Sequence, residues 1–273
     1  MSTEQFRGQT AVITGAASGI GMGLAQYAAK LGMNLVLADI NAAQLDQFAA
    51  TLATKTITVA TDVTDLAAVQ NLAQRTWDSF GAPDLVFNNA GILVTGFTWE
   101  IDPARFDKNM AVNVNGVLNG IRAFVPRLLE AGKASRIVNT ASIGGFLPSP
   151  LMAPYTASKF AVVGLTETLQ YEMQILSAPV KVSLLAPGPV KTSIFVNPFG
   201  DKPRNAAEQQ FVDNMLRMTQ ENGVSPEAFA EGVFKGIADG DYWLFPQPEY
   251  IEPALRARLD TILRRDQPTL NLF

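Results

Sequence analysis

The sequence contains no histidine and no cysteine among its 273 residues. The two absences exclude a Ser-His-Asp triad, a cysteine nucleophile and the usual His/Cys zinc site. They also exclude a disulfide framework, which fits a reducing compartment. Any proton transfer must therefore use Tyr, Lys, Asp or Glu, and we expect no bound metal.

Basic charge and long apolar runs are also scarce. The chain has 21 Lys and Arg against 25 Asp and Glu, a net charge of −4, whereas a nucleic-acid footprint needs a basic patch or stripe. No run of about 18 apolar residues could span a bilayer, and residues 1–10 lack the apolar core of a signal peptide. We therefore expect a soluble, cytoplasmic protein without nucleic-acid or membrane partners.

Apolar residues, in contrast, make up 48% of the chain, and they follow a repeating order. Short β-branched runs alternate with longer Ala/Leu-rich stretches, which predicts βαβ units with a parallel sheet and helices on both faces. The expected strands are residues 10–14, 34–38, 56–60, 85–88, 135–140, 180–186 and 242–245. The expected helices are residues 20–31, 42–52, 66–80, 103–130, 154–176 and 226–238. No linker divides the chain, so we expect one α/β domain over residues 1–273, a doubly wound sheet of about seven strands.

One stretch interrupts this alternation. Residues 190–225 show no strand pattern and carry several Phe and Met residues, so they are interpreted as a lid over an apolar substrate. A long connection in a compact domain is usually functional or disordered, although these side chains could also simply pack on the core. The last segment, residues 253–273, is predicted to be a C-terminal helix and tail.

The first expected strand runs into a glycine-rich loop and then a helix. Gly15, Gly19 and Gly21 would allow a tight turn, bring the backbone close to a pyrophosphate and let helix and strand pack closely. The free N–H groups at the start of the following helix favour an anion. A simple tight turn is the alternative interpretation, but the strand-loop-helix context favours dinucleotide binding.

Asp39 ends the second expected strand, about 20 residues beyond the glycines, where a carboxylate would accept hydrogen bonds from an adenosine ribose. The same carboxylate would repel a 2′-phosphate, and the neighbouring Ser18 and Ile40 supply no cation. The pattern therefore favours NAD over NADP. Alternatively, Asp39 could cap the helix that starts near Ala42.

Tyr155 and Lys159 are spaced so that a helix places them on one face. A lysine ammonium held there lowers the pKa of a neighbouring phenol, which otherwise lies near about 10. In a chain without histidine, this pair is the leading candidate for acid–base chemistry.

Together these motifs resemble the short-chain dehydrogenase/reductase family, in its single-domain branch of this approximate length. The resemblance rests on TGAASGIG at 14–21, Asp62 with Val63, NNAG at 88–91, Asn113 with Ser142, YTASK at 155–159 and PGPVKT at 187–192. It covers about the first 190 residues well. The family implies a Rossmann-type fold, a bound nicotinamide cofactor and a catalytic set of Asn113, Ser142, Tyr155 and Lys159.

The resemblance also implies a role for each matched residue. Ser142 would donate a hydrogen bond to the substrate oxygen, and Asn113 would bend its helix and hold a water that links Lys159 to solvent. The cofactor contacts implied by the loop, by Asp39 and by the resemblance are Gly15, Ser18, Gly19, Ile20, Gly21, Asp39, Ile40, Asp62, Val63, Asn89, Ala90, Gly91, Tyr155, Lys159, Pro187, Gly188, Val190 and Thr192. Taken alone, Ser142 could be a turn residue and Asn113 any polar helix residue.

The sequence therefore predicts an NAD-dependent oxidoreductase that interconverts a secondary alcohol and a ketone, with Tyr155 as general acid and base. Apolar loops at the carboxyl ends of the strands favour an apolar or aromatic substrate. They contain Ile92, Leu93, Val94, Phe97, Ile143, Phe146, Leu147, Met152, Ile194, Phe195 and Phe199. The alternatives are a sugar-nucleotide epimerase or dehydratase and a non-catalytic nucleotide-binding regulator. Since family members commonly pair, we also expect a homodimer or homotetramer.

Overall fold

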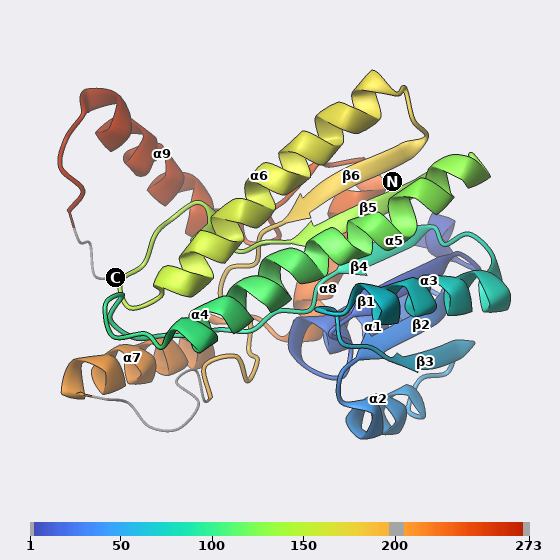
Figure 1. Cartoon of the computed structure of the whole chain (residues 1–273), viewed down its shortest axis with the longest axis horizontal. Helices are drawn as coiled ribbons and strands as arrows, with labels where there is room; N and C mark the ends of the chain where they lie inside the picture. The colour runs from blue at the N-terminus through green and yellow to red at the C-terminus, as the bar shows by residue number, and fades with distance from the viewer. Residues whose placement is uncertain (1–2, 197–204, 270–273) are drawn as a thin grey trace.

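The computed structural model describes residues 3–196 and 205–269. Within these ranges seven parallel strands form one sheet in the order β3-β2-β1-β4-β5-β6-β7 (Figure 1). The strands are β1 Thr10–Thr14, β2 Asn34–Asp39, β3 Thr56–Ala60, β4 Leu85–Asn88, β5 Ser135–Thr140, β6 Val180–Leu185 and β7 Trp243–Leu244. The expected Rossmann-type α/β fold is confirmed.

Along the chain, strands are first added on one side of β1 and then on the other, so a topological switch point lies between β1 and β4. β1 pairs with β2 on one side and β4 on the other, so the chain builds outward to β3 and then returns to β4. In open α/β sheets a ligand binds beyond the carboxyl ends of the strands at such a switch point. The loop after β1 and the loop after β4 both end there.

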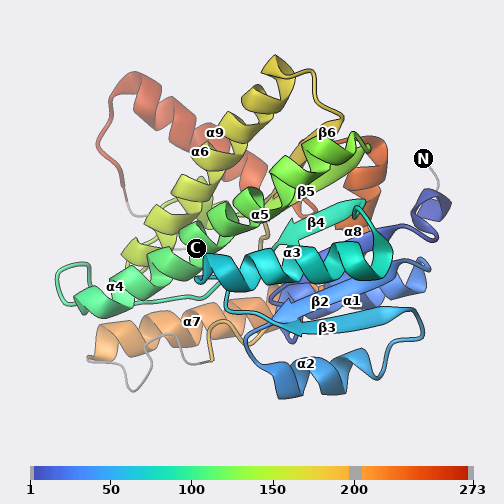
Figure 2. The same ribbon diagram turned by 45° about the vertical axis from the view of Figure 1, so that its right-hand side comes forward.

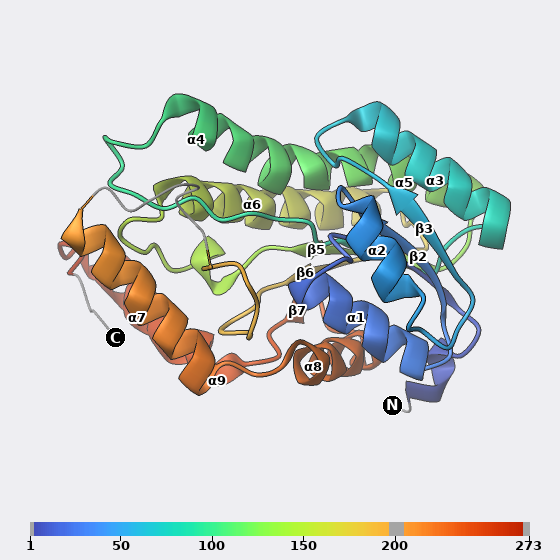
Figure 3. The ribbon, with the colours of Figure 1, turned by 90° about the horizontal axis from the view of Figure 1, so that it is seen from below.

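Helices cover both faces of the sheet, as Figures 2 and 3 show. One face carries α1, α2 and α8, and the other carries α3, α5 and α6. The bounds are α1 Gly19–Lys30, α2 Ala42–Ala49, α3 Leu66–Phe80, α4 Pro103–Met110, α5 Gly116–Ala131, α6 Ala153–Ile175, α7 Ala206–Asn222, α8 Pro226–Asp239 and α9 Pro248–Arg264. Short turns of 3-10 helix occupy Thr3–Phe6 and Ile143–Gly145.

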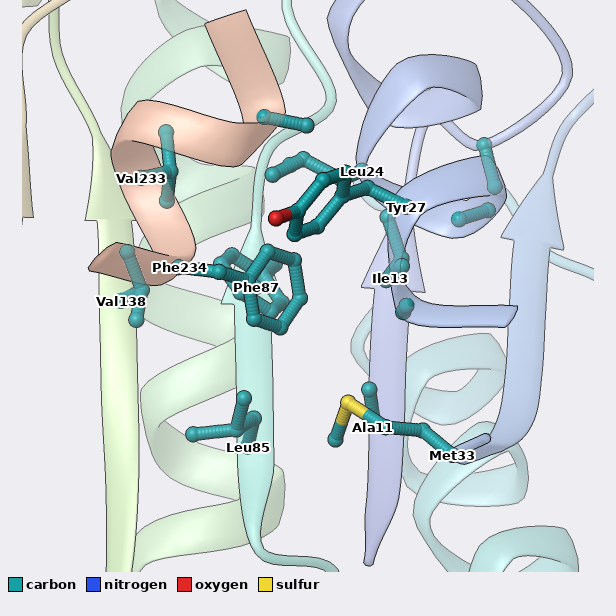
Figure 4. Packing of buried hydrophobic residues seen from close by; sticks show 14 of the residues in the cluster. Ala11, Ile13, Leu24, Tyr27, Met33, Leu85, Phe87, Val138, Val233 and Phe234 are labelled. Atoms are coloured by element: carbon teal, nitrogen blue, oxygen red, sulfur yellow. The ribbon is translucent and has the colours of Figure 1, made fainter. Parts of the chain in front are cut away.

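The core on the α1 side joins the first strand to the last helices. Phe234 of α8 packs against Phe87 of β4, with ring centroids 5.8 Å apart, and against Tyr27 of α1 at 5.6 Å (Figure 4). Ile13 of β1 and Leu24 of α1 are fully buried in the same cluster. Because residues from both ends of the chain share this core, the described parts of the chain form one domain.

The helix expected over 103–130 is not a single α-helix. A π turn, Ala111–Asn115, separates α4 from α5, and its last hydrogen bond runs from Gly116 N to Ala111 O. One extra residue therefore widens the helix at this point, as single π turns commonly do at functional sites. Asn113, where a bend is expected, lies inside this wider turn.

Two helices near the C-terminus differ from the expectation. α7, with 17 residues, lies within the stretch interpreted as a substrate lid, for which no helix was predicted. α9 begins at Pro248 rather than near residue 253, because Pro248 occupies the first turn and Pro253 is accommodated inside the helix. Figure 1 places α7, at the lower left, and α9, at the upper left, on the side of the molecule beyond the carboxyl ends of the strands. Among the described residues, no helix is both long and apolar enough to cross a membrane.

Candidate active site

The loop between β1 and α1 is folded so tightly that two glycines are required. Gly15 has φ of +66°, and a Cβ there would lie 2.8 Å from the Cα of Ala90. A Cβ on Gly21 would overlap the carbonyl oxygen of Gly15 and lie 2.8 Å from Nδ2 of Asn89. Helix α1 can therefore start directly against the end of β1. Its N-cap residue, Ser18, makes no side-chain capping hydrogen bond, so the first N–H groups of α1 remain available to an anion.

Thr14 links the glycine-rich loop to the loop after β4 through hydrogen bonds. Its Oγ1 accepts hydrogen bonds from the backbone N–H of Asn89 at 2.9 Å and of Ala90 at 3.1 Å, and donates to Phe87 O. The Asn89 side chain donates from Nδ2 to Thr14 O at 2.9 Å. Two expected cofactor residues, Asn89 and Ala90, thus lie directly against the glycine-rich loop.

Asp39 fixes the other side of the same loop. Its Oδ2 accepts from Ala17 N at 3.0 Å and its Oδ1 from Asn41 N at 2.9 Å. The helix that follows is capped by Asn41, whose side chain accepts from Gln44 N. The alternative role of Asp39 as the N-cap of α2 is therefore wrong. Ile40, beside it, is 71% exposed and free to face a bound ligand.

A pocket of about 570 Å³ opens over the glycine-rich loop. Its wall combines the loop and α1 with α2, α7, the start of α8 and the segment after Val190. The lining residues are Ala17, Ser18, Gly19, Met22, Gln44, Lys191, Thr192, Ser193, Val196, Leu216, Thr219, Gln220 and Pro226. Among these described residues Lys191 carries the one charge, so the pocket favours an anionic group. Sequence reasoning missed the α7 residues because it did not predict that α7 exists, and it missed Gln44 because no motif marks this residue of α2.

The remaining expected cofactor residues lie around the same end of the sheet. Asp62 is exposed and accepts from Thr64 N and Thr64 Oγ1 through Oδ1. Val63 is buried against Gly116, and its carbonyl accepts from Asn119 Nδ2 at 2.9 Å. Asp62 therefore has a surface position at the carboxyl end of β3, while Val63 packs towards α5.

The segment from Pro187 to Thr192 forms the wall opposite the glycine-rich loop. Pro187 O accepts from Ile143 N at 3.0 Å, and Gly188 packs against the side chain of Gln247. Val190 is buried and forms a parallel bridge with Val224, the residue between α7 and α8. Thr192 reaches Gly19, with its Cγ2 only 3.2 Å from where a Cβ of Gly19 would be. The structure therefore brings the two distant motifs into contact.

Tyr155 and Ser142 meet at the start of α6. Ser142 Oγ accepts a hydrogen bond from Gly144 N at 3.0 Å. A Cβ on Gly144 would lie 3.4 Å from the Tyr155 ring and 3.5 Å from Ser142 Oγ, so the glycine admits both groups. Burial raises the pKa of the Tyr155 hydroxyl, and the hydrogen bond with Ser142 lowers it in part. The expected lowering by Lys159 is not found.

Lys159 lies one helical turn further along, 4% exposed. Its Nζ donates to Thr140 O at 2.9 Å and is 5.6 Å from the centre of the Tyr155 ring. Burial lowers the pKa of Lys159 to about 8, because water no longer solvates the ammonium. The Lys159 ammonium thus lies beside the Tyr155 phenol, but its desolvation has a cost in folding free energy.

This cost predicts a pH-dependent effect of Lys159→Met. The folded pKa of about 8 lies below the value near 10.5 of the unfolded chain, so the unfolded chain binds more protons between these values and the wild type gains stability as pH rises. We expect Lys159→Met to raise the unfolding free energy by about 2–3 kcal/mol at about pH 7, and this gain to fade towards about pH 10.

Urea unfolding of the cofactor-free protein across this pH range measures the effect. Lys181→Met is the matched control, because Lys181 is exposed on β6. Equal unfolding free energies for the wild type and Lys159→Met at neutral pH would contradict the desolvation argument.

Asn113 is fully buried in the π turn, and its amide is held from several sides. Oδ1 accepts from Ile92 N at 2.8 Å, while Nδ2 donates to Ile92 O at 2.9 Å and to Ser158 Oγ at 3.0 Å. A Cβ on Gly91 would lie 3.4 Å from Asn113 Oδ1 and 3.6 Å from Lys159 Nζ. Gly91 therefore separates Asn113 from Lys159, and the four expected catalytic residues surround one point beside the loop after β4.

The apolar residues expected to line the substrate site differ in how far they are buried. Leu93, Val94 and Met152 are buried, and Phe146 packs against Trp243 and Phe245 with ring centroids 5.9 Å and 5.7 Å away. Phe97 stacks on Trp99, which is 78% exposed. Phe199 lies outside the described residues. Over residues 3–196 and 205–269, no group of three or more Asp or Glu side chains could hold a metal ion.

The chain is similar in sequence and in fold to known proteins. Residues 9–202 match the family model for short chain dehydrogenase. A C alpha-dehydrogenase of Sphingobium sp. strain SYK-6 is 32% identical over 95% of this chain and 88% of its own length. A solved short chain dehydrogenase/reductase of Burkholderia phymatum in complex with NAD has a TM-score of 0.92 and 36% identity over 98% of this chain and 99% of that one. An alcohol dehydrogenase of the archaeon Thermococcus sibiricus, complexed with 5-hydroxy-NADP, has a TM-score of 0.70 and 26% identity over 84% of this chain and 90% of that one.

Proposed function

This chain belongs to the short-chain dehydrogenase/reductase family of oxidoreductases, and from that premise we propose that it interconverts a secondary alcohol and a ketone with NAD. One observation carries the proposal. The Tyr155 ring and the Ser142 hydroxyl both lie against Gly144, and the Lys159 ammonium is 5.6 Å from the ring centre, next to a loop whose glycines suit a dinucleotide. A proton donor and acceptor, a second hydroxyl and a cation at one point are what alcohol oxidation needs.

The residues present fit a nicotinamide dinucleotide. Gly15 and Gly21 leave the space that side chains would fill, and α1 directs uncapped N–H groups towards the pocket. Lys191 adds a positive charge to the same pocket, which suits a pyrophosphate. Asp39, already oriented by two backbone N–H groups, keeps lone pairs for ribose hydroxyls. When bound, the cofactor supplies the hydride acceptor or donor that the chain itself lacks.

The chain's own residues carry out the proton transfer to and from the substrate. In the oxidation direction the Tyr155 phenolate accepts the proton of the substrate hydroxyl, and in the reduction direction the phenol donates it to the substrate oxygen. Ser142 donates a hydrogen bond to that oxygen as charge develops on it. Lys159 lies beside the phenol, and its depressed pKa allows it to pass a proton on near neutral pH. Asn113 supports the relay from Lys159.

The substrate is proposed to be apolar or aromatic. Phe97 and the exposed Trp99 form a stacked pair on the loop after β4, and Gly96, beside them, pairs with Met152 at the start of the Tyr155 helix. Aromatic side chains near the reacting group favour hydrophobic contacts over sugar hydroxyls. Both residues belong to the loop that also holds Asn113 through Ile92.

The two alternatives are less well supported. An epimerase or dehydratase would bind a sugar nucleotide, whereas the stacked Phe97 and Trp99 favour an apolar or aromatic substrate. A non-catalytic regulator has no need to bury a lysine ammonium beside a tyrosine. Turnover of an alcohol or ketone would exclude the regulator, and a sugar nucleotide as the sole substrate would favour the epimerase.

A substrate panel tests the proposed reaction. We would assay 1-phenylethanol, 2-octanol and cyclohexanol, with their ketones, by the absorbance of the reduced cofactor, with NAD and NADP in parallel. We expect faster turnover of 1-phenylethanol than of the sugar alcohol control, sorbitol, and faster turnover with NAD. Sorbitol as the better substrate would overturn the proposed substrate class.

The cofactor preference is tested at Asp39 and Ile40. Removing the carboxylate and adding a cation, Asp39→Ser with Ile40→Arg, should favour NADP, because a guanidinium pairs with a 2′-phosphate that the carboxylate repels. Charge-assisted bonds of this kind are worth about 1.5–3 kcal/mol, so we expect the NAD/NADP ratio of kcat/KM to change about 100-fold.

The control for this change is Ile40→Gln with Asp39 kept, which alters the exposed side chain without adding charge. Because Asp39 also holds Ala17 N, we expect the double variant to lose some affinity for both cofactors. An unchanged ratio would mean that Asp39 only orders the loop.

Two further expectations stay predictions. The first is that residues 190–225 form a substrate lid; α7 lies in this range and lines the cofactor pocket, while residues 197–204 fall outside the described ranges. The second is that the enzyme is a homodimer or homotetramer.

A further inference from the structure

Ser158 is a buried hydroxyl for which the proposed mechanism has no use. It lies three residues after Tyr155 in α6 and is 0% exposed. Its Oγ donates to the backbone carbonyl of Tyr155 at 2.7 Å and accepts from Asn113 Nδ2 at 3.0 Å. One hydroxyl therefore joins the first turn of α6 to the π turn.

The Asn113 amide at the other end of this bridge is itself fixed. Oδ1 and Nδ2 both bond the backbone of Ile92, and Nδ2 also lies 3.3 Å from Asn109 Oδ1. Asn109 in turn donates to Ile92 O at 3.2 Å. The π turn and the loop after β4 thus form one hydrogen-bonded unit, and Ser158 Oγ is where that unit contacts α6.

The hydrogen bond between Ser158 and Asn113 lies close to the proposed catalytic groups of Tyr155 and Lys159. Gly91 separates the Asn113 amide from the Lys159 ammonium, with little space on either side. Tyr155 must stay close to Ser142, which lies in the segment after β5, at the start of the Ile143–Gly145 turn, rather than in α6. A small movement of the first turn of α6 would change both separations at once.

We propose that Ser158 is a positioning residue that holds the first turn of α6, and with it Tyr155, against the π turn of Asn113. The inference rests on the proposed function, since it assigns Tyr155 the proton transfer. A competing explanation is that Ser158 only stabilises the packing of α6, as buried hydroxyls often do.

Thr166 offers a matched control for that explanation. It lies on the same helix about 12 Å further along and is also 0% exposed. Its Oγ1 donates to Val162 O at 2.6 Å and accepts from Asn139 Nδ2 at 3.1 Å, so it repeats the pair of bonds that Ser158 makes. Ser158→Ala and Thr166→Val each remove one such bridge, but only the first is next to Tyr155.

The test follows the ionisation of Tyr155 directly. The protein is labelled with carbon-13 at tyrosine Cζ, Tyr155→Phe identifies the resonance, and the wild type and both variants are titrated with and without NAD. If Ser158 positions Tyr155, Ser158→Ala loosens the hydrogen bond with Ser142, and the Tyr155 titration moves up by about half a unit or more. Thr166→Val should leave it unchanged. The kcat of Ser158→Ala for 1-phenylethanol should fall about tenfold or more, since a misplaced catalytic group is costly.

An unchanged Tyr155 titration in Ser158→Ala, or an equal change in both variants, would overturn the inference. The titration needs no substrate, so failure of the wild type to oxidise any alcohol would refute the proposed function while the result for Ser158 still stands. If Ser158→Ala does not fold, Ser158→Cys replaces it, because a thiol keeps the volume with a weak donor. It is expected to move the titration in the same direction.

Discussion

Tyr155→Phe should lower kcat about 1,000-fold or more and leave cofactor affinity within about twofold. General acid–base catalysis by a positioned side chain is worth about 10²–10⁴ in rate, and the lost hydroxyl is also the group whose pKa Ser142 lowers. The ring remains to fill the space beside Gly144, so the fold around the site should persist. The measurement is kcat for 1-phenylethanol, with NADH binding followed by fluorescence.

Tyr171→Phe is the matched control, because Tyr171 lies on the same helix with 60% of its surface exposed. It should behave as the wild type in both measurements. Full activity in Tyr155→Phe would remove the acid–base assignment, and with it the reason to bury Lys159. A parallel loss of NADH binding would instead mean that Tyr155 mainly holds the cofactor.

The pattern of strands and the motifs at their ends could be predicted from the sequence because both are local. β1, β3, β4 and β5 match the expected ranges without change, since buried parallel strands are short β-branched runs. Each site residue at or just after a strand end, such as Asp39 or Ser142, is then placed by topology. Parallel strands bring their carboxyl ends to the same edge of the sheet.

The missed helix α7 had a signal that was present in the sequence. Asn205 and Glu208 have the spacing of a capping box, and Asn205 does accept from Glu208 N at 3.0 Å. The prolines that precede this helix in the sequence favour a loop instead. What no pattern could supply is that α7 lies over the glycine-rich loop and completes the pocket with Thr219 and Leu216.

The ionisation of the acid–base pair could also not be predicted from spacing. A four-residue spacing places Lys159 beside Tyr155, but it says nothing about burial. In the folded chain burial raises the pKa of Tyr155 and lowers that of Lys159 to about 8, so each group is displaced towards its neutral form. Binding of a positively charged nicotinamide would favour the phenolate again, which couples cofactor binding to proton transfer.

Gly21→Ala should abolish cofactor binding, with an expected loss of affinity for ADP-ribose of at least about 100-fold. The added Cβ would overlap Gly15 O and approach Asn89 Nδ2, and both partners are held by the network around Thr14. The N-terminus of α1 must therefore move away from the loop. Two charge-assisted hydrogen bonds are worth about 1.5–3 kcal/mol each. Their combined loss therefore exceeds the roughly 2.8 kcal/mol that corresponds to a 100-fold change in affinity.

The same substitution elsewhere separates this effect from a general intolerance of glycine replacement. Gly164 lies inside α6, where no atom of the described residues would come within 4 Å of an added Cβ, so Gly164→Ala should bind ADP-ribose normally and gain about 0.5–1 kcal/mol of stability. Calorimetric titration with ADP-ribose, below the melting temperature of each variant, compares the two. Because ADP-ribose lacks nicotinamide, the result isolates the pyrophosphate end of the site from Tyr155. Wild-type affinity in Gly21→Ala would show that the close approach of α1 to β1 is not what binds the dinucleotide.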